Sequence, residues 1–394
     1  MAGMPCETRQ SVLRQIKGRV PNSKRETALY PYMKLPVGPE CHFNWPDSEE
    51  FSVEFQRLLG AAQEGGSMVA ECFLVLSRID PQDHADSWHR EWERMADLSH
   101  QRGNAAFERG HLPTAQGNWL RALNYYQAST FALDIADTKR QKAIEAMRAC
   151  ARRYIEHLSP AGEVVEIPWI EGHALEAYFL PAPASPARAP VVVCMGEPGH
   201  CKEEFLFKVT RHARERGVSL LVVDLLGPGD GAAFEDVVGR PDLETSVGSV
   251  MDYLTTRDDV DDQRVAIFGD GAGSSFVARG IALDYRYAAA VCDGGLWEMH
   301  ERAFLNHRAG KAGGDGGRSR YHCPVLITVG EQGWLTRDVV IDLFERLRAR
   351  QPGVSLKIFA SEETAASQGH HDNPTLANEF IFDWIADRLD SART

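Results

Sequence analysis

The hydrophobic pattern divides the chain into a helical part followed by a part in which strands and helices alternate. From about residue 47 to residue 158, apolar residues recur at spacings of three and four, which is typical of amphipathic helices. Glu50–Leu59 and Ser67–Ile79 show this spacing clearly. The segment Arg109–Pro113 contains a glycine and a proline, which end and begin helices, so it predicts a break between two long helices.

β-Strand patterns begin at Glu163. Glu163–Ile170 and His173–Leu180 predict two strands joined at Glu171 and Gly172, and a Pro-rich loop follows. Continuous apolar runs then alternate with helical segments, which is typical of a parallel sheet covered on both faces. The runs are Val191–Met195, Val218–Asp224, Arg264–Phe268, Ala288–Cys292, Pro324–Val329 and Ser355–Phe359, and the helical segments lie at about 204–216, 242–256, 273–284, 336–350 and 374–389.

This pattern predicts an α/β fold with a mostly parallel, doubly wound sheet and a functional site at the carboxyl ends of its strands. We expect three parts: an irregular N-terminal arm (1–46), a helical cap domain (47–160) and the α/β domain (161–394). A length of 394 residues allows a large and a smaller domain.

The amino-acid composition and net charge limit which binding partners and which cellular location we expect for the protein. The formal net charge of −13 opposes nucleic-acid or anionic-membrane binding, which needs a basic face. The eight cysteines form no Cys-x-x-Cys pair, and several stand in apolar runs, as reduced buried cysteines do. The first residues lack the apolar core of a secretory signal, and no run is long enough to span a membrane. We therefore expect a cytoplasmic protein.

One turn carries the strongest chemical signal. Val265–Phe268 runs into Gly269-Asp-Gly-Ala-Gly273 and then a helix, which is the strand-turn-helix context of the G-x-S-x-G nucleophile elbow. The tip is Gly271, which reaches a positive φ without a side-chain penalty but offers no oxygen nucleophile. If Asp270 were the nucleophile in a shifted frame, Phe268 would stand where the turn needs a small residue.

These residues make the second half resemble an α/β-hydrolase domain. Trp88–Trp92, Arg121–Tyr126 and the segment Val223–Gly231 resemble a narrower group. It includes 2,6-dihydroxypseudooxynicotine hydrolase, the fungal hydrolases that shorten pigment polyketides, and the fermentation-respiration-switch proteins. The resemblance spans about residues 47–390 and implies a helical cap, with a homodimer through the cap helices. It also implies a Ser-His-Asp triad that cleaves carbon–carbon or ester bonds.

The resemblance implies that two triad positions are vacant. The serine position is Gly271, and the acid position in Gly330-Glu-Gln-Gly333 is Gly333. The histidine loop, residues 369–374, places His370 at the best match, with His371 beside it. We therefore expect His370 to remain as the catalytic acid or base.

Two carboxylates are candidates to orient His370. Asp293 ends a predicted strand, where the fold can place a substitute acid, although an aspartate before two glycines also forms turns. Glu331 stands two residues before the vacant acid position, although it also fits a solvated loop. The His-His-Asp run lacks a third ligand, so we expect neither a metal nor a cofactor.

Backbone N–H groups predict an oxyanion hole. The residue after the tip, Ala272, and the loop after the first parallel strand supply them, and Gly196 and Glu197 are the expected contributors from that loop. His200 and Cys201 form a second possible base and nucleophile, although packing is the commoner role of such a cysteine.

Aromatic residues are candidates for a substrate wall. Trp297 and Trp334 follow predicted strand ends, and the cap offers Trp119, Tyr125 and Tyr126. An aromatic stripe on a helix also serves core packing, which is its commoner role.

The sequence predicts an enzyme that acts on a small molecule without a serine nucleophile. The first hypothesis is a non-hydrolytic cyclisation, elimination, retro-aldol reaction or rearrangement of a polyketide-like or aromatic secondary metabolite, driven by His370 and the oxyanion hole. The alternatives are a hydrolase or carbon–carbon lyase that uses His-activated water, and a catalytically silent binding or regulatory protein.

Overall fold

The computed structural model describes residues 49–80, 82–170, 173–183, 188–196, 200–225, 243–295, 321–333 and 335–392. All of them belong to one compact unit, Asn44–Thr394. The predicted arm, residues 1–46, lies outside the described residues. No described helix is long and apolar enough to cross a membrane.

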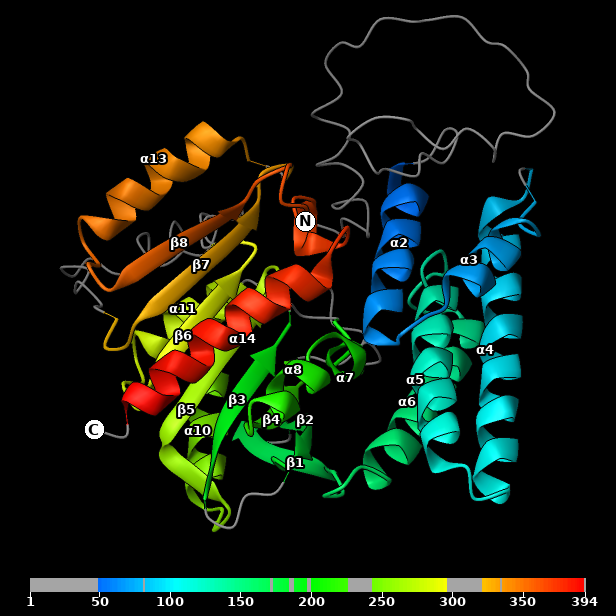
Figure 1. Cartoon of the computed structure of the whole chain (residues 1–394), viewed down its shortest axis with the longest axis horizontal. Helices are drawn as coiled ribbons and strands as arrows, with labels where there is room; N and C mark the ends of the chain where they lie inside the picture. The colour runs from blue at the N-terminus through cyan, green and yellow to red at the C-terminus, as the bar shows by residue number, and fades with distance from the viewer. Residues whose placement is uncertain are drawn as a thin grey trace, which may run out of the picture. The chain divides into compact units, whose positions relative to one another are not determined.

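Helices make up the first part of this unit (Figure 1). The predicted break is confirmed: Gly110 has a φ of +76° between the two long helices, and Pro113 stands in the first turn of the second. The elements are α2 (Glu49–Gly60), η2 (Ala61–Glu64), α3 (Val69–Leu76), α4 (His84–Glu108), α5 (Leu112–Ser129) and α6 (Thr138–Glu156).

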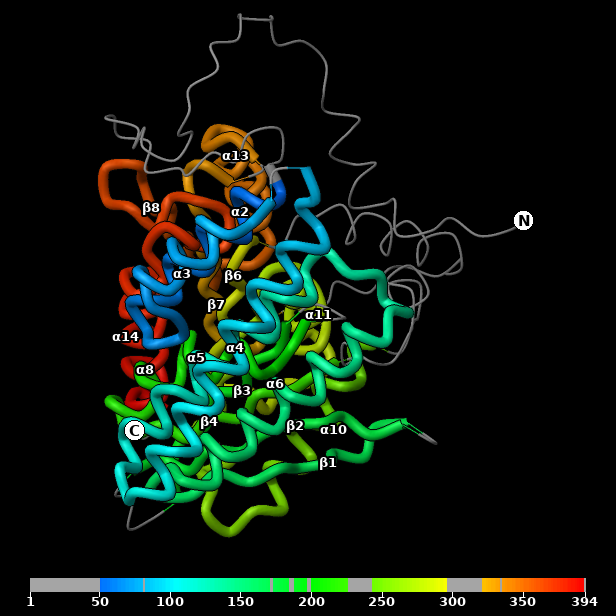
Figure 2. The backbone as a smooth tube through the Cα atoms, turned by 90° about the vertical axis from the view of Figure 1, so that its right-hand side faces the viewer, coloured from blue at the N-terminus to red at the C-terminus, as the bar shows by residue number. Residues whose placement is uncertain are grey.

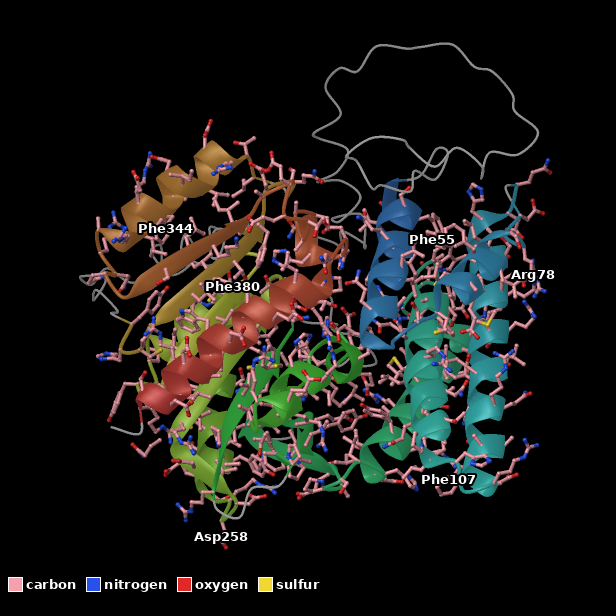
Figure 3. The ribbon with its side chains drawn as sticks, in the orientation of Figure 1. Phe55, Arg78, Phe107, Asp258, Phe344 and Phe380 are labelled. Carbon is pink, nitrogen blue, oxygen red and sulfur yellow. The ribbon has the colours of Figure 1, made fainter. Side chains whose placement is uncertain are left out.

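Aromatic side chains form the core of the helical part. Trp88 and Trp92 of α4, one turn apart, are both fully buried, with ring centroids 5.7 Å apart. Phe55 of α2 and Phe107 of α4 mark two ends of this part in Figure 3. The Phe107 ring packs 5.5 Å from Trp119 of α5. The apolar spacing seen in the sequence is therefore the packing face of these helices.

An eight-stranded sheet, in the order β1-β2-β4-β3-β5-β6-β7-β8, forms the second part. β1 and β2 pair antiparallel with each other, β2 pairs antiparallel with β4, and the remaining pairs are parallel. The strands are β1 (Glu163–Ile170), β2 (His173–Leu180), β3 (Ala189–Met195), β4 (Ser219–Val223), β5 (Val260–Asp270), β6 (Ala289–Asp293), β7 (Val325–Gly330) and β8 (Val354–Phe359). Each predicted strand is present, and the mostly parallel α/β fold is confirmed.

Helices cover both faces of the sheet. α8 and α14 lie on one face, and α10 and α11 lie on the other, as the two views in Figure 1 and Figure 2 show. The helices of this part are α7 (Glu204–Lys208), α8 (Thr210–Glu215), α10 (Thr245–Thr255), α11 (Gly273–Ile281), α13 (Arg337–Arg348) and α14 (Pro374–Ser391), with the short helix η3 (Gln368–His370) before α14.

One predicted helix is wrong. Residues 204–216 form two helices, α7 and α8, because Val209 leaves the helical conformation with a φ of −130°. The backbone carbonyl of Lys208 instead accepts a hydrogen bond of 3.0 Å from the Asn378 side chain on α14. The break places the end of α7 beside the carboxyl ends of the central strands.

A buried ion cluster joins the helical part to the sheet part. Glu64 of η2 accepts hydrogen bonds from Arg211 and His212 of α8 and from Thr375 of α14. Burial opposes the ionisation of this carboxyl, but its hydrogen bonds lower the pKa of Glu64 to about 2.

The strand order reverses at β3, which pairs with both β4 and β5. In such sheets a ligand binds where the strands end on either side of the reversal, so the functional site is expected at the carboxyl ends of these strands.

Candidate functional site

The turn after β5 has the shape of a nucleophile elbow. Gly271 has a φ of +55°, between the end of β5 at Asp270 and the start of α11 at Gly273. A Cβ atom on Gly273 would lie 2.6 Å from the Met195 carbonyl oxygen, so this position requires glycine. A Cβ atom on Gly271 would meet no described atom within 4 Å. Within the described residues, the flank of the turn is closely packed and no atom fills the space beside its tip, which we call the open tip.

Neither serine beside the turn replaces the missing hydroxyl. Ser274 is fully buried, and its Oγ lies 3.0 Å from the Gly269 carbonyl oxygen and 2.9 Å from that of Asp293. Ser275 is also buried, and its Oγ has no hydrogen-bond partner in the described part of the chain. Both lie inside α11, which begins two residues after the tip.

Asp293 and His370 form a buried pair beside this turn. Asp293 ends β6 directly opposite Asp270 of β5 in the sheet register. Its Oδ1 lies 2.8 Å from His370 Nε2 and accepts a 2.7 Å hydrogen bond from Thr328 Oγ1. A Cβ atom on the next residue, Gly294, would lie 3.2 Å from the Cα of Gly271, so the pair stands close to the tip.

The hydrogen bonds of His370 fix its protonation. Its Nδ1 lies 2.5 Å from the Ala365 carbonyl oxygen, which can only accept, so Nδ1 carries a proton. Burial opposes both charges of the pair, but the interaction between the partners outweighs it, lowering the pKa of Asp293 and raising that of His370. Both ring nitrogens of His370 thus face an oxygen acceptor, and the raised pKa favours the protonated ring. In this arrangement the ring can supply a charge that Asp293 balances, but neither nitrogen is free to serve as a base or to donate to a substrate.

The loop that carries His370 is conformationally unusual. Thr364, Ala365 and His370 have φ values of +67°, +55° and +57°, a region that side-chain-bearing residues rarely adopt. The carboxylate of Asp372 holds the loop, since it accepts hydrogen bonds from the backbone N–H groups of Ala366 and Ser367. Such strain persists where the surrounding structure enforces it and gathers at functional sites.

A second group of charges lies on the other side of the turn. Lys208, the last residue of α7, donates from Nζ to Asp270 Oδ2 at 2.6 Å. Glu204 lies one turn earlier, with His200 Nε2 3.6 Å from its carboxylate. Burial alone disfavours both cations, but the neighbouring carboxylates outweigh it and raise the pKa of Lys208 and of His200.

Three of these side chains could ligate a metal ion. Atoms of His200, Glu204 and Asp270 lie within 4.8 Å of one another, a grouping that the sequence did not reveal. The ammonium of Lys208 already contacts Asp270, and its positive charge opposes a divalent cation at the same place. The arrangement is better described as two adjoining ion pairs.

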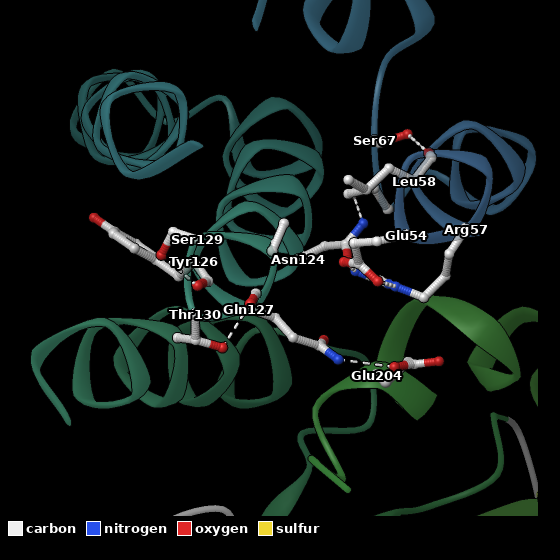
Figure 4. Close-up of polar contacts among 12 residues, drawn as sticks. Glu54, Arg57, Leu58, Ser67, Asn124, Tyr126, Gln127, Ser129, Thr130 and Glu204 are labelled. Atoms are coloured by element: carbon white, nitrogen blue, oxygen red, sulfur yellow. Dashed lines mark hydrogen bonds and ion pairs between the residues drawn. The ribbon is translucent and has the colours of Figure 1, made fainter. Parts of the chain in front are cut away.

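The helical part reaches these residues directly. Gln127 of α5 donates from its amide to Glu204 Oε2 at 2.8 Å, and Figure 4 shows this side chain directed at the carboxylate. A Cβ atom on Gly60, at the end of α2, would lie 2.1 Å from the His371 carbonyl oxygen. The helical part therefore borders the candidate site, as a cap would.

The two carboxylate candidates are separated by the structure. Asp293 contacts His370, whereas Glu331 is bound to Arg337 and to Ser361 at the surface. Gly333 lies in the turn after β7, where a Cβ atom would come within 2.9 Å of the Gln368 side chain. The expectation that Glu331 orients His370 is therefore wrong for this conformation.

The aromatic residues of the cap do not form an open wall. Trp119 and Tyr125 are fully buried and Tyr126 is nearly so, and each polar atom has an internal acceptor: Asn104, Glu71 and Asp97, respectively. Their assignment as substrate-binding residues does not fit this packing, because their polar ends are already satisfied within the helices. Trp297 and Trp334 lie outside the described residues.

Only some of the residues predicted to form the oxyanion hole are seen to lie together. Gly273, which follows Ala272, packs against Gly196 at the end of β3, and a Cβ atom on Gly196 would overlap the His200 ring. Glu197 lies outside the described residues. Burial raises the pKa of Cys201 well above its usual value, which disfavours a reactive thiolate.

Sequence reasoning missed Glu204 and Lys208. A signal was available, since His200, Glu204 and Lys208 follow one another at intervals of four residues. Polar residues at this spacing share one face of a helix, and here that face meets the turn after β5.

Comparisons with known proteins agree with this geometry. No family model matches the chain. It is 28% identical over 350 residues to the hydrolyase PoxO of Penicillium oxalicum, covering 84% of this chain and 78% of that protein. It is 32% identical over 264 residues to the 20-hydroxy-prefusarin hydrolase FUS2 of Gibberella moniliformis, covering 63% of this chain and 61% of that protein.

Solved structures agree on the fold. The crystal structure of 2,6-dihydroxy-pseudo-oxynicotine hydrolase matches with a TM-score of 0.67 at 20% identity, covering 84% of this chain and 96% of that one. The mostly parallel sheet, the elbow-shaped turn after β5 and this structural match lead to one conclusion: the chain has the α/β-hydrolase fold.

Proposed function

We propose that this protein is an enzyme that converts a polyketide-like or aromatic carbonyl compound without hydrolysis and without a covalent serine intermediate. The observation that carries the proposal is the turn at Gly271, which keeps the elbow shape and an open tip but has no hydroxyl. A covalent acyl-enzyme requires a nucleophile at this place. The name of the relative FUS2 includes a substrate, 20-hydroxy-prefusarin, which supports a natural-product substrate here.

The chemistry that remains is stabilisation of negative charge. Cyclisation, elimination, retro-aldol cleavage and rearrangement of carbonyl compounds all pass through a species with negative charge on an oxygen. The proton lost as that charge forms passes to solvent water, because neither nitrogen of His370 is free to take it. The charge of His370 lies close to the tip, but both of its ring nitrogens face protein acceptors. The donors that remain for a substrate oxygen are backbone N–H groups at the start of α11, which would point to the same region. Fixed donors of this kind act without any nucleophile.

Hydrolysis by water that His370 activates fits less well. A general base needs an unprotonated nitrogen within reach of the water, and both ring nitrogens of His370 face acceptors. We therefore give His370 the role of a fixed charge, with Asp293 as the residue that positions it. A catalytically silent binding protein remains the outcome to test against.

Product analysis in ¹⁸O-labelled water separates these functions. We expect an aryl β-hydroxyketone to be cleaved or dehydrated, and an aryl 1,3-diketone to yield no carboxylic acid. Replacing His370 with glutamine should slow the first reaction by about tenfold, because it removes a positive charge close to the tip and leaves Asp293 without its ion pair. Labelled acid from the diketone would instead establish a hydrolase, and a lack of turnover across both compounds would favour a binding protein.

A serine restored at the tip tests the role of Gly271. Gly271→Ser should lower the free energy of unfolding by about 1–2 kcal/mol, because its φ is +55°. We expect no burst of nitrophenol from 4-nitrophenyl acetate, because no nitrogen of His370 is free to activate the new hydroxyl. Gly271→Ala is the matched control, since it carries the same backbone strain without the hydroxyl. A burst confined to the serine variant would show that the other groups still support acyl transfer.

A further inference from the structure

We infer that Lys208 is a catalytic residue of this site, whose ammonium donates a hydrogen bond to a substrate oxygen that becomes negatively charged. This inference rests on the proposed function and narrows its substrate class to carbonyl or phenolic compounds that react through an enolate or phenolate. It assigns a role to a residue that neither the sequence motifs nor the relatives indicate.

The first argument is position. Lys208 Nζ lies 2.6 Å from Asp270 Oδ2, and Asp270 is the residue before the tip. Asp293, which stands opposite Asp270 in the sheet, also interacts electrostatically with Lys208. The ammonium is thus close to residues on two sides of Gly271, where a Cβ atom would meet no described atom within 4 Å.

The second argument is unused hydrogen-bonding capacity. An ammonium has three donor hydrogens, and buried donors are ordinarily satisfied. The Lys208 side chain is 9% exposed, yet among the described residues its Nζ has a single hydrogen-bond acceptor, Asp270. His200 Nε2, on the same face, is buried and has no hydrogen-bond partner in the described part of the chain. His200 is turned toward Glu204, whereas the ammonium of Lys208 keeps two donor hydrogens without a described acceptor, which a substrate oxygen can bind.

The third argument is charge. Burial alone lowers the pKa of Lys208, but the carboxylates of Asp270, Glu204 and Asp293 outweigh it and raise that pKa. The amine therefore stays protonated and cannot form a Schiff base, which requires a neutral amine. A permanent cation in a partly enclosed site stabilises developing negative charge more strongly than it would in water. Lys208 thus supplies charge stabilisation without any covalent step.

The probe for this role is 4-nitrophenol, a phenol whose ionised form has a distinct visible absorbance. The full-length protein should bind the phenolate in preference to the phenol. Lys208→Met alone would leave Asp270 as a buried, uncompensated charge, so the decisive variant is Lys208→Met with Asp270→Asn, which removes both charges together. We expect it to lose about tenfold in phenolate affinity, or about 1.4 kcal/mol, relative to the natural protein.

Two further variants complete the experiment. Lys208→Arg should retain most of the preference, because the positive charge remains. Lys357→Met with Glu363→Gln is the control, since it also removes one lysine–carboxylate pair, here between β8 and the loop after it, without changing the net charge. The inference is overturned if the double variant binds phenolate as the natural protein does, or if the natural protein shows no preference for phenolate.

The result separates this inference from the proposed function. If the β-hydroxyketone is turned over equally well by the double variant, Lys208 has no catalytic part while the proposed function stands. If phenolate binding depends on Lys208 but neither carbonyl compound is turned over, Lys208 binds an anion and the proposed function fails.

Discussion

Two buried lysines of this protein stand in nearly the same local setting but differ in how fully their ammonium groups are bound. Lys202 Nζ lies 2.6 Å from Asp224, at the end of β4, and Lys208 Nζ lies 2.6 Å from Asp270, at the end of β5. Lys202 also reaches Glu176 at 3.2 Å and Glu203 at 3.5 Å. Lys208 has no second hydrogen-bond acceptor among the described residues.

This difference separates a structural ion cluster from one that can receive a ligand. The Lys202 side chain is 1% exposed, and its ammonium donates hydrogen bonds to Asp224 and Glu176 and lies 3.5 Å from a third carboxylate, that of Glu203. Lys208 lies beside a turn with an open tip and retains donors. A buried charged group stabilises one conformation when all its hydrogen bonds are made within the protein. When some of its donors are unused, the group can bind a ligand.

The largest expected effect is on stability. Lys202→Met should lower the free energy of unfolding by about 3–5 kcal/mol, because it leaves Asp224 and Glu203 buried without a cation. Lys208→Met should cost less, about 1–3 kcal/mol, because the Asp270 side chain is 12% exposed and keeps some contact with water. Urea unfolding of both variants tests this order. An equal or larger loss for Lys208→Met would remove the distinction between the two lysines.

The Lys202 cluster also predicts a pH dependence. Burial outweighs the attraction of Lys202 and raises the pKa of Asp224 to about 6 from 3.8. The folded protein therefore holds this proton more tightly than the unfolded chain, so stability falls as the pH rises from about 4 to about 6. A shift of about two units corresponds to a fall of about 3 kcal/mol.

Unfolding free energies measured across that pH range test the assignment. Asp224→Asn should flatten the falling limb between about pH 4 and pH 6. Asp293 has the opposite sign: its pKa is lowered, mainly because His370 outweighs the effect of burial, so its contribution is lost as the pH falls below about 4. Asp293→Asn would also free the buried ring of His370 to lose its proton in this range, so the control is Asp259→Asn. The pKa of Asp259 is lowered, first by its hydrogen bonds with Arg257, and its replacement should leave the limb between pH 4 and pH 6 in place. A limb unchanged in Asp224→Asn would contradict the prediction.

The sequence predicted the elements well and the charged site poorly, for one physical reason. A buried parallel strand needs a continuous apolar run, which is visible locally, so β3 to β8 were found within a few residues of their ends. The contacts of Asp293 and Glu331 depend on where the strand ends and loops lie in three dimensions. Sequence spacing could therefore not decide between them, whereas the structure places Asp293 on His370.

Lys208 and the cap aromatics show the two ways in which local reading fails. Lys208 reaches the site because the helix breaks at Val209, and nothing in an apolar helical pattern reveals that break. Trp119, Tyr125 and Tyr126 share a helical stripe that would look the same on a core face or on a substrate wall. Their hydrogen bonds to other residues of the helices show that they pack in the core, and those partner residues are far away in the sequence.

The smallest expected effect on the free energy of unfolding concerns two adjacent serines, one whose hydroxyl has hydrogen-bond partners and one whose hydroxyl has no described partner. Ser274 Oγ lies within hydrogen-bond distance of two backbone carbonyls, those of Gly269 and Asp293, which join the ends of β5 and β6. Ser274→Ala should therefore cost about 1 kcal/mol, the net value of one hydrogen bond. Ser275 Oγ is buried without a described partner, so Ser275→Ala removes an unsatisfied hydroxyl and should change stability by less than about 0.5 kcal/mol.

Thermal or urea unfolding of the two serine variants provides a matched comparison, because both remove the same atom from neighbouring positions of one helix. A larger loss for Ser275→Ala would mean that its hydroxyl has a partner beyond the described residues. The free energy of the turn would then depend on that partner. The role of Lys208 rests on the same comparison between polar groups whose hydrogen bonds are all made and those with unused donors. That comparison would then have to be repeated with the new contact included.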